Sequence, residues 1–209
     1  VATALQQGCK GHATLLQRWQ LIRIHSQLVR ISWELIQIKR YPQVFNNCFL
    51  LSSGFSIKET GAGTVIMTAG HLCEVSQNIT MIDFPMVMTA NSEVYVQDKN
   101  GNYFNGIILK FDADEDLCTI LLPDTEIPAM RIANKDPEIG ERLYNLSAPR
   151  GIFSPNNIMI FEGFYTGTFP SGWSGYSIPA APGSSGSVVI NKRGEVVGMI
   201  DAVIIGFNV

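Results

Sequence analysis

Short apolar runs separated by turn residues fill the chain from Cys48 onward. The runs lie at residues 48–57, 63–69, 93–97, 102–110, 117–122, 142–147, 157–165, 186–190 and 195–203. Such runs are typical of strands, and Asn100-Gly101 and Asn191–Gly194 each favour a tight hairpin turn. No long helical pattern lies among them. Many short strands with Gly and Pro at the joints predict an all-β sandwich or barrel.

Two periodicities meet in the segment before these runs. Leu15, Trp19 and Ile22 recur at helical spacing, whereas apolar and polar residues alternate from Val29 to Leu35. Because the first period is that of a helix and the second that of a strand, we split the segment. We predict a short basic amphipathic helix over residues 12–25 and a strand over residues 28–38.

Charge is distributed unevenly along the chain. Residues 1–40 hold six Lys or Arg and one acid, a net charge of +5, so the remainder must carry −8 to give the total of −3. The total leaves little positive potential to hold nucleic acid, which we do not expect as a partner.

Charged residues also interrupt the apolar stretch 15–38 before it reaches the roughly 18 residues of a membrane span. The predicted helix over residues 12–25 could instead dock onto a protein assembly or an anionic membrane surface, or pack against its own domain.

The four cysteines are spread along the chain, with no Cys-x-x-Cys pair and no histidine at zinc-finger spacing. This spacing argues against a structural metal site, and the count is too low for a disulfide scaffold. We expect mostly buried thiols at Cys9, Cys48, Cys73 and Cys118, and neither a metal nor an organic cofactor.

One Gly-Ser-rich loop has the composition that a nucleophile needs. A nucleophilic hydroxyl requires a base, a carboxylate that orients the base, and N–H donors for the oxyanion. Ser185 lies in Pro182-Gly183-Ser184-Ser185-Gly186-Ser187, where the glycines permit a tight turn that exposes a side chain. Ser185 is therefore the candidate nucleophile.

A histidine and an aspartate lie at the ends of other predicted strands. His71 follows an apolar run and small residues, and Asp116 comes directly before the run 117–122. Taken singly, each of these residues is more often a turn, surface or core residue than a catalyst. Their joint occurrence in the order His, Asp, Ser favours catalysis. Since His12 and His25 lie in the amino-terminal segment, His71 is the sole candidate base in the β region.

Three sequence blocks resemble the signatures of trypsin-like serine proteases. They are TAGHLC at 68–73, DLCTILL at 116–122 and GSSGSVVINKRGEVVGMI at 183–200. The resemblance covers about residues 28–203 and is closest to HtrA-like peptidases. Segments 147–153, 162–167 and 176–187 are also similar to proteases encoded by tailed bacteriophages, for which a place in the virion or the bacterial cell envelope would fit.

The resemblance implies two antiparallel six-stranded β-barrels with the active site between them. His71 would be the general base, Asp116 would orient it, and Ser185 would form the acyl-enzyme, with the N–H groups of Gly183 and Ser185 as the oxyanion hole. Asp112 and Asp114 rank below Asp116, because only Asp116 abuts the strand.

The acidic, Pro-flanked stretch 123–128 reads as a linker between the two β halves. We therefore expect an amino-terminal segment at residues 1–27, a first barrel at 28–125 and a second barrel at 126–209.

Substrate preference rests on a weaker pattern. The resemblance places residues 177–181 at the base of the specificity pocket and Asp201, Ala202 and Val203 along its wall. This lining favours a small or aliphatic side chain, although Asp201 could attract a basic one. We thus expect a serine endopeptidase that acts on proteins or peptides. The alternative is a protease-like fold that serves as a structural or binding component of a larger assembly.

Overall fold

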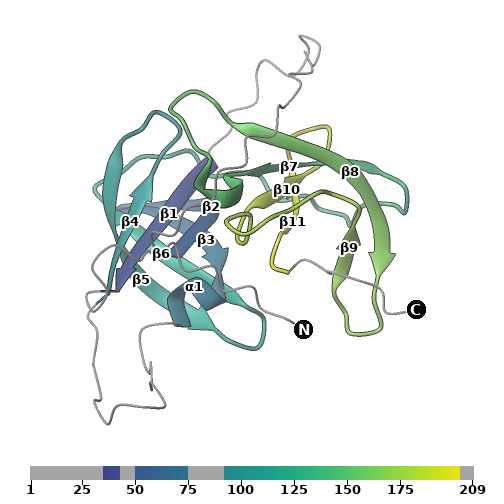
Figure 1. Ribbon diagram of the computed structural model, residues 1–209, viewed down its shortest axis with the longest axis horizontal. Helices are drawn as coiled ribbons and strands as arrows, with labels where there is room; N and C mark the ends of the chain where they lie inside the picture. The colour runs from purple at the N-terminus through teal and green to yellow at the C-terminus, as the bar shows by residue number, and fades with distance from the viewer. Residues whose placement is uncertain (1–34, 43–49, 75–91, 203–209) are drawn as a thin grey trace, which may run out of the picture.

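The computed structural model describes residues 35–42, 50–74 and 92–202, which form two β units joined by an irregular segment (Figure 1). The first unit contains β1 (Leu35–Pro42), β2 (Leu50–Thr60), β3 (Gly63–Ala69), the short helix α1 (Gly70–Glu74), β4 (Ser92–Gln97), β5 (Tyr103–Asp112) and β6 (Leu117–Pro123). The second contains β7 (Arg142–Ser147), a 3₁₀ turn at Pro149–Gly151, β8 (Met159–Thr168), β9 (Ser174–Tyr176), β10 (Val188–Ile190) and β11 (Val196–Met199).

The first unit is a closed antiparallel barrel with the strand order β1-β2-β3-β6-β5-β4, closed by pairing of β4 with β1. Alternate residues of its strands point inward, as the strand period requires. In β6, for example, Cys118, Ile120 and Leu122 are buried while their neighbours are partly exposed. The first predicted six-stranded barrel is confirmed.

The second unit is an open five-stranded sheet with the order β11-β10-β7-β8-β9. The expectation of a second closed barrel of six strands is therefore not met by the described part of the chain. Among the described residues, no ladder joins β11 to β9, and Ile200 after β11 hydrogen-bonds Gly186 and Ser187 in the loop before β10. The residues from Val203 onward lie outside the described chain.

Most strand predictions agree with the structure. The run 63–69 is β3 with the same bounds, and β10 and β11 form the hairpin predicted around Asn191–Gly194. The predicted strand 28–38 is described only from Leu35, and the predicted helix over 12–25 lies outside the described residues. The short strand β9 was not predicted. The three-part division at residues 27 and 125 stays a prediction.

A shared apolar cluster joins the two units and fixes the site between them. Phe55 of β2 packs with residues of the second unit, among them Leu146, Val188 and Ile190. All four side chains are at most 2% exposed. Burial of this kind contributes about 1.5–3 kcal/mol per large side chain. The barrel and the sheet are thus held against each other along β2.

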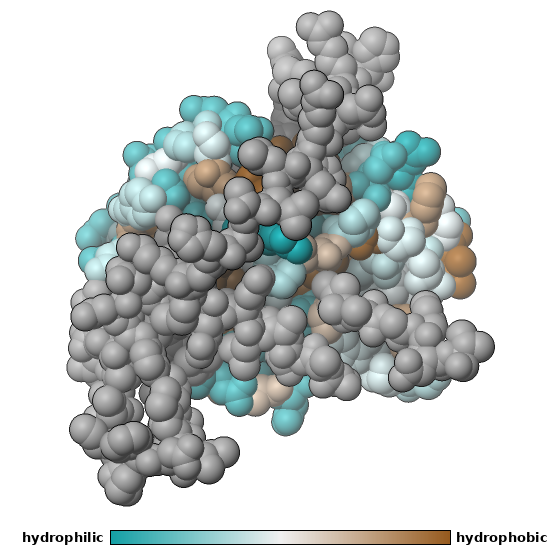
Figure 2. All heavy atoms as spheres, in the orientation of Figure 1, coloured by the Kyte–Doolittle hydropathy of each residue, from teal (hydrophilic) through white to brown (hydrophobic). Residues whose placement is uncertain are grey.

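The described surface is mixed in character. On the face shown in Figure 2, hydrophilic residues predominate over the described part and apolar residues form small separate groups. Scattered exposed apolar side chains are ordinary in globular proteins. Among the described residues, no helix is long and apolar enough to cross a membrane.

Candidate active site

His71 lies on α1, the single helical turn that follows β3 directly. The N–H of Gly70 donates to the carbonyl of Asp116 at 2.7 Å. A Cβ on Gly70 would meet the backbone of Asp116 and Leu117 at 2.8 Å, closer than real Cβ contacts occur. The glycine therefore permits the close approach that brings His71 to the start of β6.

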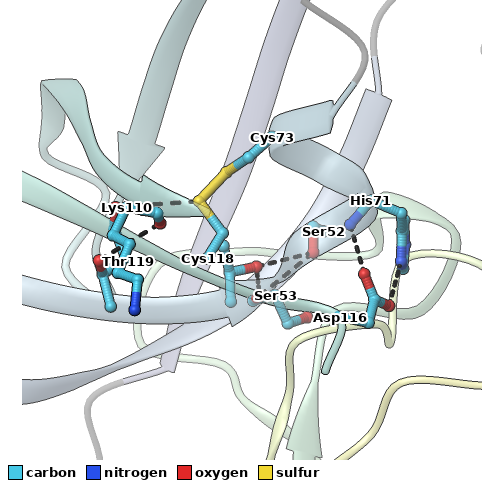
Figure 3. The surroundings of a disulfide bond; sticks show 9 residues. Ser52, Ser53, His71, Cys73, Lys110, Asp116, Cys118 and Thr119 are labelled. Carbon is cyan, nitrogen blue, oxygen red and sulfur yellow. Dashed lines mark hydrogen bonds and ion pairs between the residues drawn. A yellow bond between two sulfur atoms is a disulfide. The ribbon is translucent and has the colours of Figure 1, made fainter. Parts of the chain in front are cut away.

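Asp116 holds His71 at two points. Nδ1 of His71 lies 2.7 Å from Oδ2 of Asp116, and the backbone N–H of His71 donates to Oδ1 of the same carboxylate (Figure 3). The aspartate has a positive φ of 48°, which aspartate tolerates better than most residues. The structure thus brings together the predicted base and the predicted orienting carboxylate, with Nδ1–H directed at Asp116.

A disulfide between Cys73 and Cys118 lies beside this pair (Figure 3). The expectation of buried thiols is therefore wrong for these two cysteines. The fold brings α1 against β6, so that two cysteines 45 positions apart in sequence come within 6.3 Å between their Cα atoms. Spacing alone could not show this, because the pairing depends on tertiary contact.

Ser185 lies in a tight loop before β10, with a positive φ of 94° at Gly183 and of 77° at Gly186. Within this loop the N–H of Ser184 donates to Ala181 at 2.8 Å and that of Ser187 to Ser184 at 2.9 Å. In the described part of the chain, the N–H groups of Gly183 and Ser185 make no hydrogen bond. These two donors are the ones predicted for the oxyanion hole.

Two serines of β2 anchor the Ser185 loop to the barrel, and sequence reasoning did not single them out. The carbonyl of Ser185 accepts from Ser52 Oγ at 2.6 Å and from the N–H of Ser53 at 2.9 Å. Ser53 Oγ donates to the carbonyl of Gly183 at 2.8 Å and accepts from the N–H of Ala148 at 3.0 Å. Both side chains are at most 1% exposed. Small buried polar residues in a strand were the available signal, since buried hydroxyls need partners.

Asp201 connects Ser185 to the His71–Asp116 pair. Ser185 Oγ donates to the carbonyl of Asp201 at 3.4 Å. The carboxylate Oδ1 of Asp201 lies 3.8 Å from Nδ1 of His71. Among the described residues, no hydrogen bond joins Ser185 Oγ to His71. The three predicted catalytic residues are gathered around Asp201, and the serine hydroxyl is turned toward its backbone.

The electrostatics of the cluster follow from its hydrogen bonds. The hydrogen bond to Asp116 raises the pKa of His71 above its ordinary value of 6.5, against the opposing effect of burial. Burial alone would raise the pKa of Asp116, but hydrogen bonds with His71 and Asp201 outweigh it and lower the value to about 2. Burial, the hydrogen bond to Asp116 and the charge of Asp116 raise the pKa of Asp201 to about 7.

His71, Asp116 and Asp201 form the one group of potential metal ligands in the part of the chain that the structure describes. Each offers one atom, and these atoms lie within 4.8 Å of one another. Nδ1 of His71 already lies at hydrogen-bond distance from Asp116, so an ion there would have to displace that proton. We interpret the group as a hydrogen-bonded cluster.

The predicted specificity residues are only partly described. Asp201 directs its carboxylate toward His71, Ala202 is exposed, and Val203 lies outside the described residues. A separate apolar cavity of about 260 Å³ borders β2, β3 and β11. It includes none of the predicted site residues and is therefore not the substrate pocket of this site.

Comparisons with known proteins agree with the fold. The family model described as a trypsin-like peptidase domain matches residues 52–199. Among solved structures, a serine endoprotease from Yersinia pestis is similar in fold, with a TM-score of 0.62 and 19% sequence identity. The similarity covers 81% of this chain and 54% of that one, so the chain spans about half the length of this relative. No curated protein sequence matches the chain.

Proposed function

The chain belongs to the trypsin-like peptidase family, and we propose that it is a serine endopeptidase whose catalytic residues are Ser185, His71 and Asp116. The observation that carries the proposal is the hydrogen bond between Nδ1 of His71 and Asp116. It fixes the proton on Nδ1 and leaves Nε2 as the basic nitrogen of the imidazole, which is the nitrogen that a nucleophile's proton must reach.

The proposed reaction has two halves. Ser185 Oγ attacks the carbonyl carbon of the scissile peptide bond while Nε2 of His71 takes the hydroxyl proton. His71 then gives this proton to the leaving amine as the C–N bond breaks, and the acyl group stays on Ser185. In the second half, water attacks the acyl carbonyl while Nε2 of His71 takes a proton from it. His71 then returns this proton to Ser185 Oγ as the ester bond breaks, which releases the free acid and restores the serine. The N–H groups of Gly183 and Ser185 would bind the oxyanion that forms in each half.

Before attack, the Ser185 hydroxyl has to turn from the carbonyl of Asp201 toward His71. Catalytic hydrogen bonds often tighten only when substrate is bound. In a non-catalytic, protease-like binding module, the Ser185 hydroxyl would instead keep its hydrogen bond to the carbonyl of Asp201. Active-site labelling separates these two possibilities.

The test is covalent reaction with a fluorophosphonate probe, read by intact mass and peptide mapping. We expect one label on Ser185, and none in Ser185→Ala or in His71→Ala. Ser171→Ala, which removes an exposed serine from the turn between β8 and β9, is the matched control and should label normally. A folded protein that takes no label and cleaves no peptide would contradict the proposal and favour the binding module.

We also propose a preference for small or aliphatic side chains at the primary specificity subsite, formed by residues 177–181 with Asp201, Ala202 and Val203. A peptide library profiled by mass spectrometry tests this, and dominant cleavage after Lys or Arg would overturn it.

Docking through residues 12–25 is a separate proposal. Deleting residues 1–26 should abolish association with an assembly or with anionic vesicles while peptidase activity remains. A phage origin and a virion or envelope location stay predictions.

A further inference from the structure

Asp201 occupies a fixed position beside all three proposed catalytic residues. It follows Ile200, whose N–H donates to Ser187 at 2.9 Å and whose carbonyl accepts from Gly186 at 2.7 Å. These two bonds tie the backbone before Asp201 to the Ser185 loop. The Asp201 carbonyl accepts from Ser185, and its carboxyl group faces the His71–Asp116 pair.

Two carboxyl groups therefore meet at one imidazole. Asp116 Oδ2 lies 2.7 Å from Nδ1 of His71, and Asp201 Oδ1 lies 3.8 Å from the same atom. The side chains of Asp116 and Asp201 are only 20% and 16% exposed, so water screens them weakly. Two carboxylates so close together are costly to ionise at once, and one of them holds a proton more tightly. Asp116, which accepts two hydrogen bonds from His71, is the one that stays ionised.

We propose that Asp201 is a positioning residue for the His71–Asp116 pair. While protonated, it donates a hydrogen bond to Asp116 and holds that carboxylate against His71; once ionised, it stabilises the imidazolium by its charge. Asp201 thereby sets the pH at which the base becomes available. This inference rests on the proposed function for its effect on catalysis, but its effect on His71 can be measured without turnover.

In the described part of the chain, the titratable groups at the cluster come from three places. His71 and Glu74 come from α1, Asp116 precedes β6, and Asp201 follows β11; the charges of Asp116, Asp201 and Glu74 all favour the protonated imidazole. The pKa of Asp201 is raised to about 7, the pKa of His71 lies above its ordinary value of 6.5, and Oδ1 of Asp201 lies 3.8 Å from Nδ1 of His71. The ionisation of one group therefore changes the pKa of the other, and the two apparent pKa values of the pair cannot be assigned to single residues.

The first test is an NMR titration of the His71 imidazole in the full chain. The resonance is identified by its loss in His71→Gln. In Asp201→Asn, whose amide still donates to Asp116, we expect His71 to lose its proton at lower pH than in the unsubstituted protein, along a single-site curve. The matched control is Asp124→Asn, which removes a negative charge from an exposed turn and keeps a residue that tolerates its φ of 55°. It should leave the titration unchanged.

The second test uses the pH dependence of peptide hydrolysis. Asp201→Asn should shift the acidic limb of kcat/KM to lower pH. Asp201→Ala should shift it likewise and lower kcat by about tenfold, as for the loss of a hydrogen bond to a charged group. A role of Asp201 in the substrate pocket alone would change KM and cleavage preference without moving the limb.

The outcomes separate this inference from the proposed function. A His71 titration that is the same in the unsubstituted protein and in folded Asp201→Asn would overturn the role of Asp201, whatever the activity. If the Asn variant does not fold, Asp201→Ser provides the same test with a smaller donor. A displaced titration in a protein that hydrolyses no peptide would support the inference and contradict the proposed function.

Discussion

Cys73 and Cys118 form a disulfide that joins the position two residues after His71 to the position two residues after Asp116. The bond connects α1, which carries His71, to β6, which begins directly after Asp116. Both cysteines are buried, at 3% and 1% exposure. The geometry of the His71–Asp116 pair therefore rests on a covalent link as well as on hydrogen bonds.

Removal of this disulfide should lower both stability and activity. The loop that it closes spans 45 positions, for which the chain-entropy model gives up to about 4 kcal/mol. We expect Cys73→Ala/Cys118→Ala to show a lower Tm and a reduced kcat, because α1 is then free to move relative to β6. Thermal unfolding and peptide hydrolysis measure this. An unchanged Tm would show that the disulfide does not constrain the fold.

Replacement of Asp116 by Asn should affect the base in two ways. The pKa of His71 is raised by its hydrogen bond to Asp116, so kcat/KM should rise with pH through a midpoint above 6.5. In Asp116→Asn that midpoint should fall, and kcat should drop by about 10⁴-fold, as when the imidazole tautomer is no longer fixed. The neighbouring exposed Asp114 offers the control, because Asp114→Asn should keep both values. Equal losses in the two variants would argue against Asp116.

The stability of the fold should depend on pH with opposite signs for the two carboxyl groups. Asp116 has a lowered pKa of about 2, so its contribution is present above pH 3.8 and is lost as the pH falls toward 2. Asp201 has a raised pKa of about 7, so its contribution is complete below pH 3.8 and is lost as the pH rises toward 7. Denaturant unfolding should therefore show that Asp201→Asn gains stability relative to the unsubstituted protein between these values. A constant difference would contradict this.

The hydroxyl of Ser53 should matter more than that of Ser52. Ser53→Ala removes the partners of two buried groups, the carbonyl of Gly183 and the N–H of Ala148. Leaving both unpaired should cost about 2–4 kcal/mol of unfolding free energy. Ser52→Ala removes the bonds of this hydroxyl to the Ser185 carbonyl and to Thr68 Oγ1. The Ser185 carbonyl still accepts from the N–H of Ser53, and Thr68 Oγ1 still donates to the carbonyl of Ser53, so the cost should be smaller. Urea unfolding measures both, and the reverse order would show that Ser53 is not the main anchor of the loop.

Particular strands show why part of the fold could be read from the sequence. The run 63–69 coincides with β3 because it begins at Gly63, contains a continuous β-prone stretch and is followed by Gly70. The β10–β11 hairpin was predictable because Asn191 and Gly194 give the turn its backbone shape, and Asn191 Oδ1 accepts from Arg193 N at 2.8 Å. β9 has only three residues, and no periodicity can be recognised over so short a length.

The second unit shows where sequence reasoning failed. The family resemblance implied a second closed barrel, but closure depends on pairing between strands far apart in the chain, and the described residues form an open sheet. The disulfide was missed for the same reason, since cysteine spacing does not reveal which elements pack together.

The sequence alone supplied the residue types of the proposed site and their order, because a hydroxyl, an imidazole and a carboxylate each stand at the end of a strand-like run. It also placed glycines at positions 70 and 186, where the backbone packs closely against Asp116 and against Ser53 and Ala69, respectively. Only the tertiary structure decided that Ser53 anchors the Ser185 loop and that Asp201 faces His71. These relations arise between residues more than 100 positions apart, where local periodicity carries no information and only packing of the barrel against the sheet sets the distance.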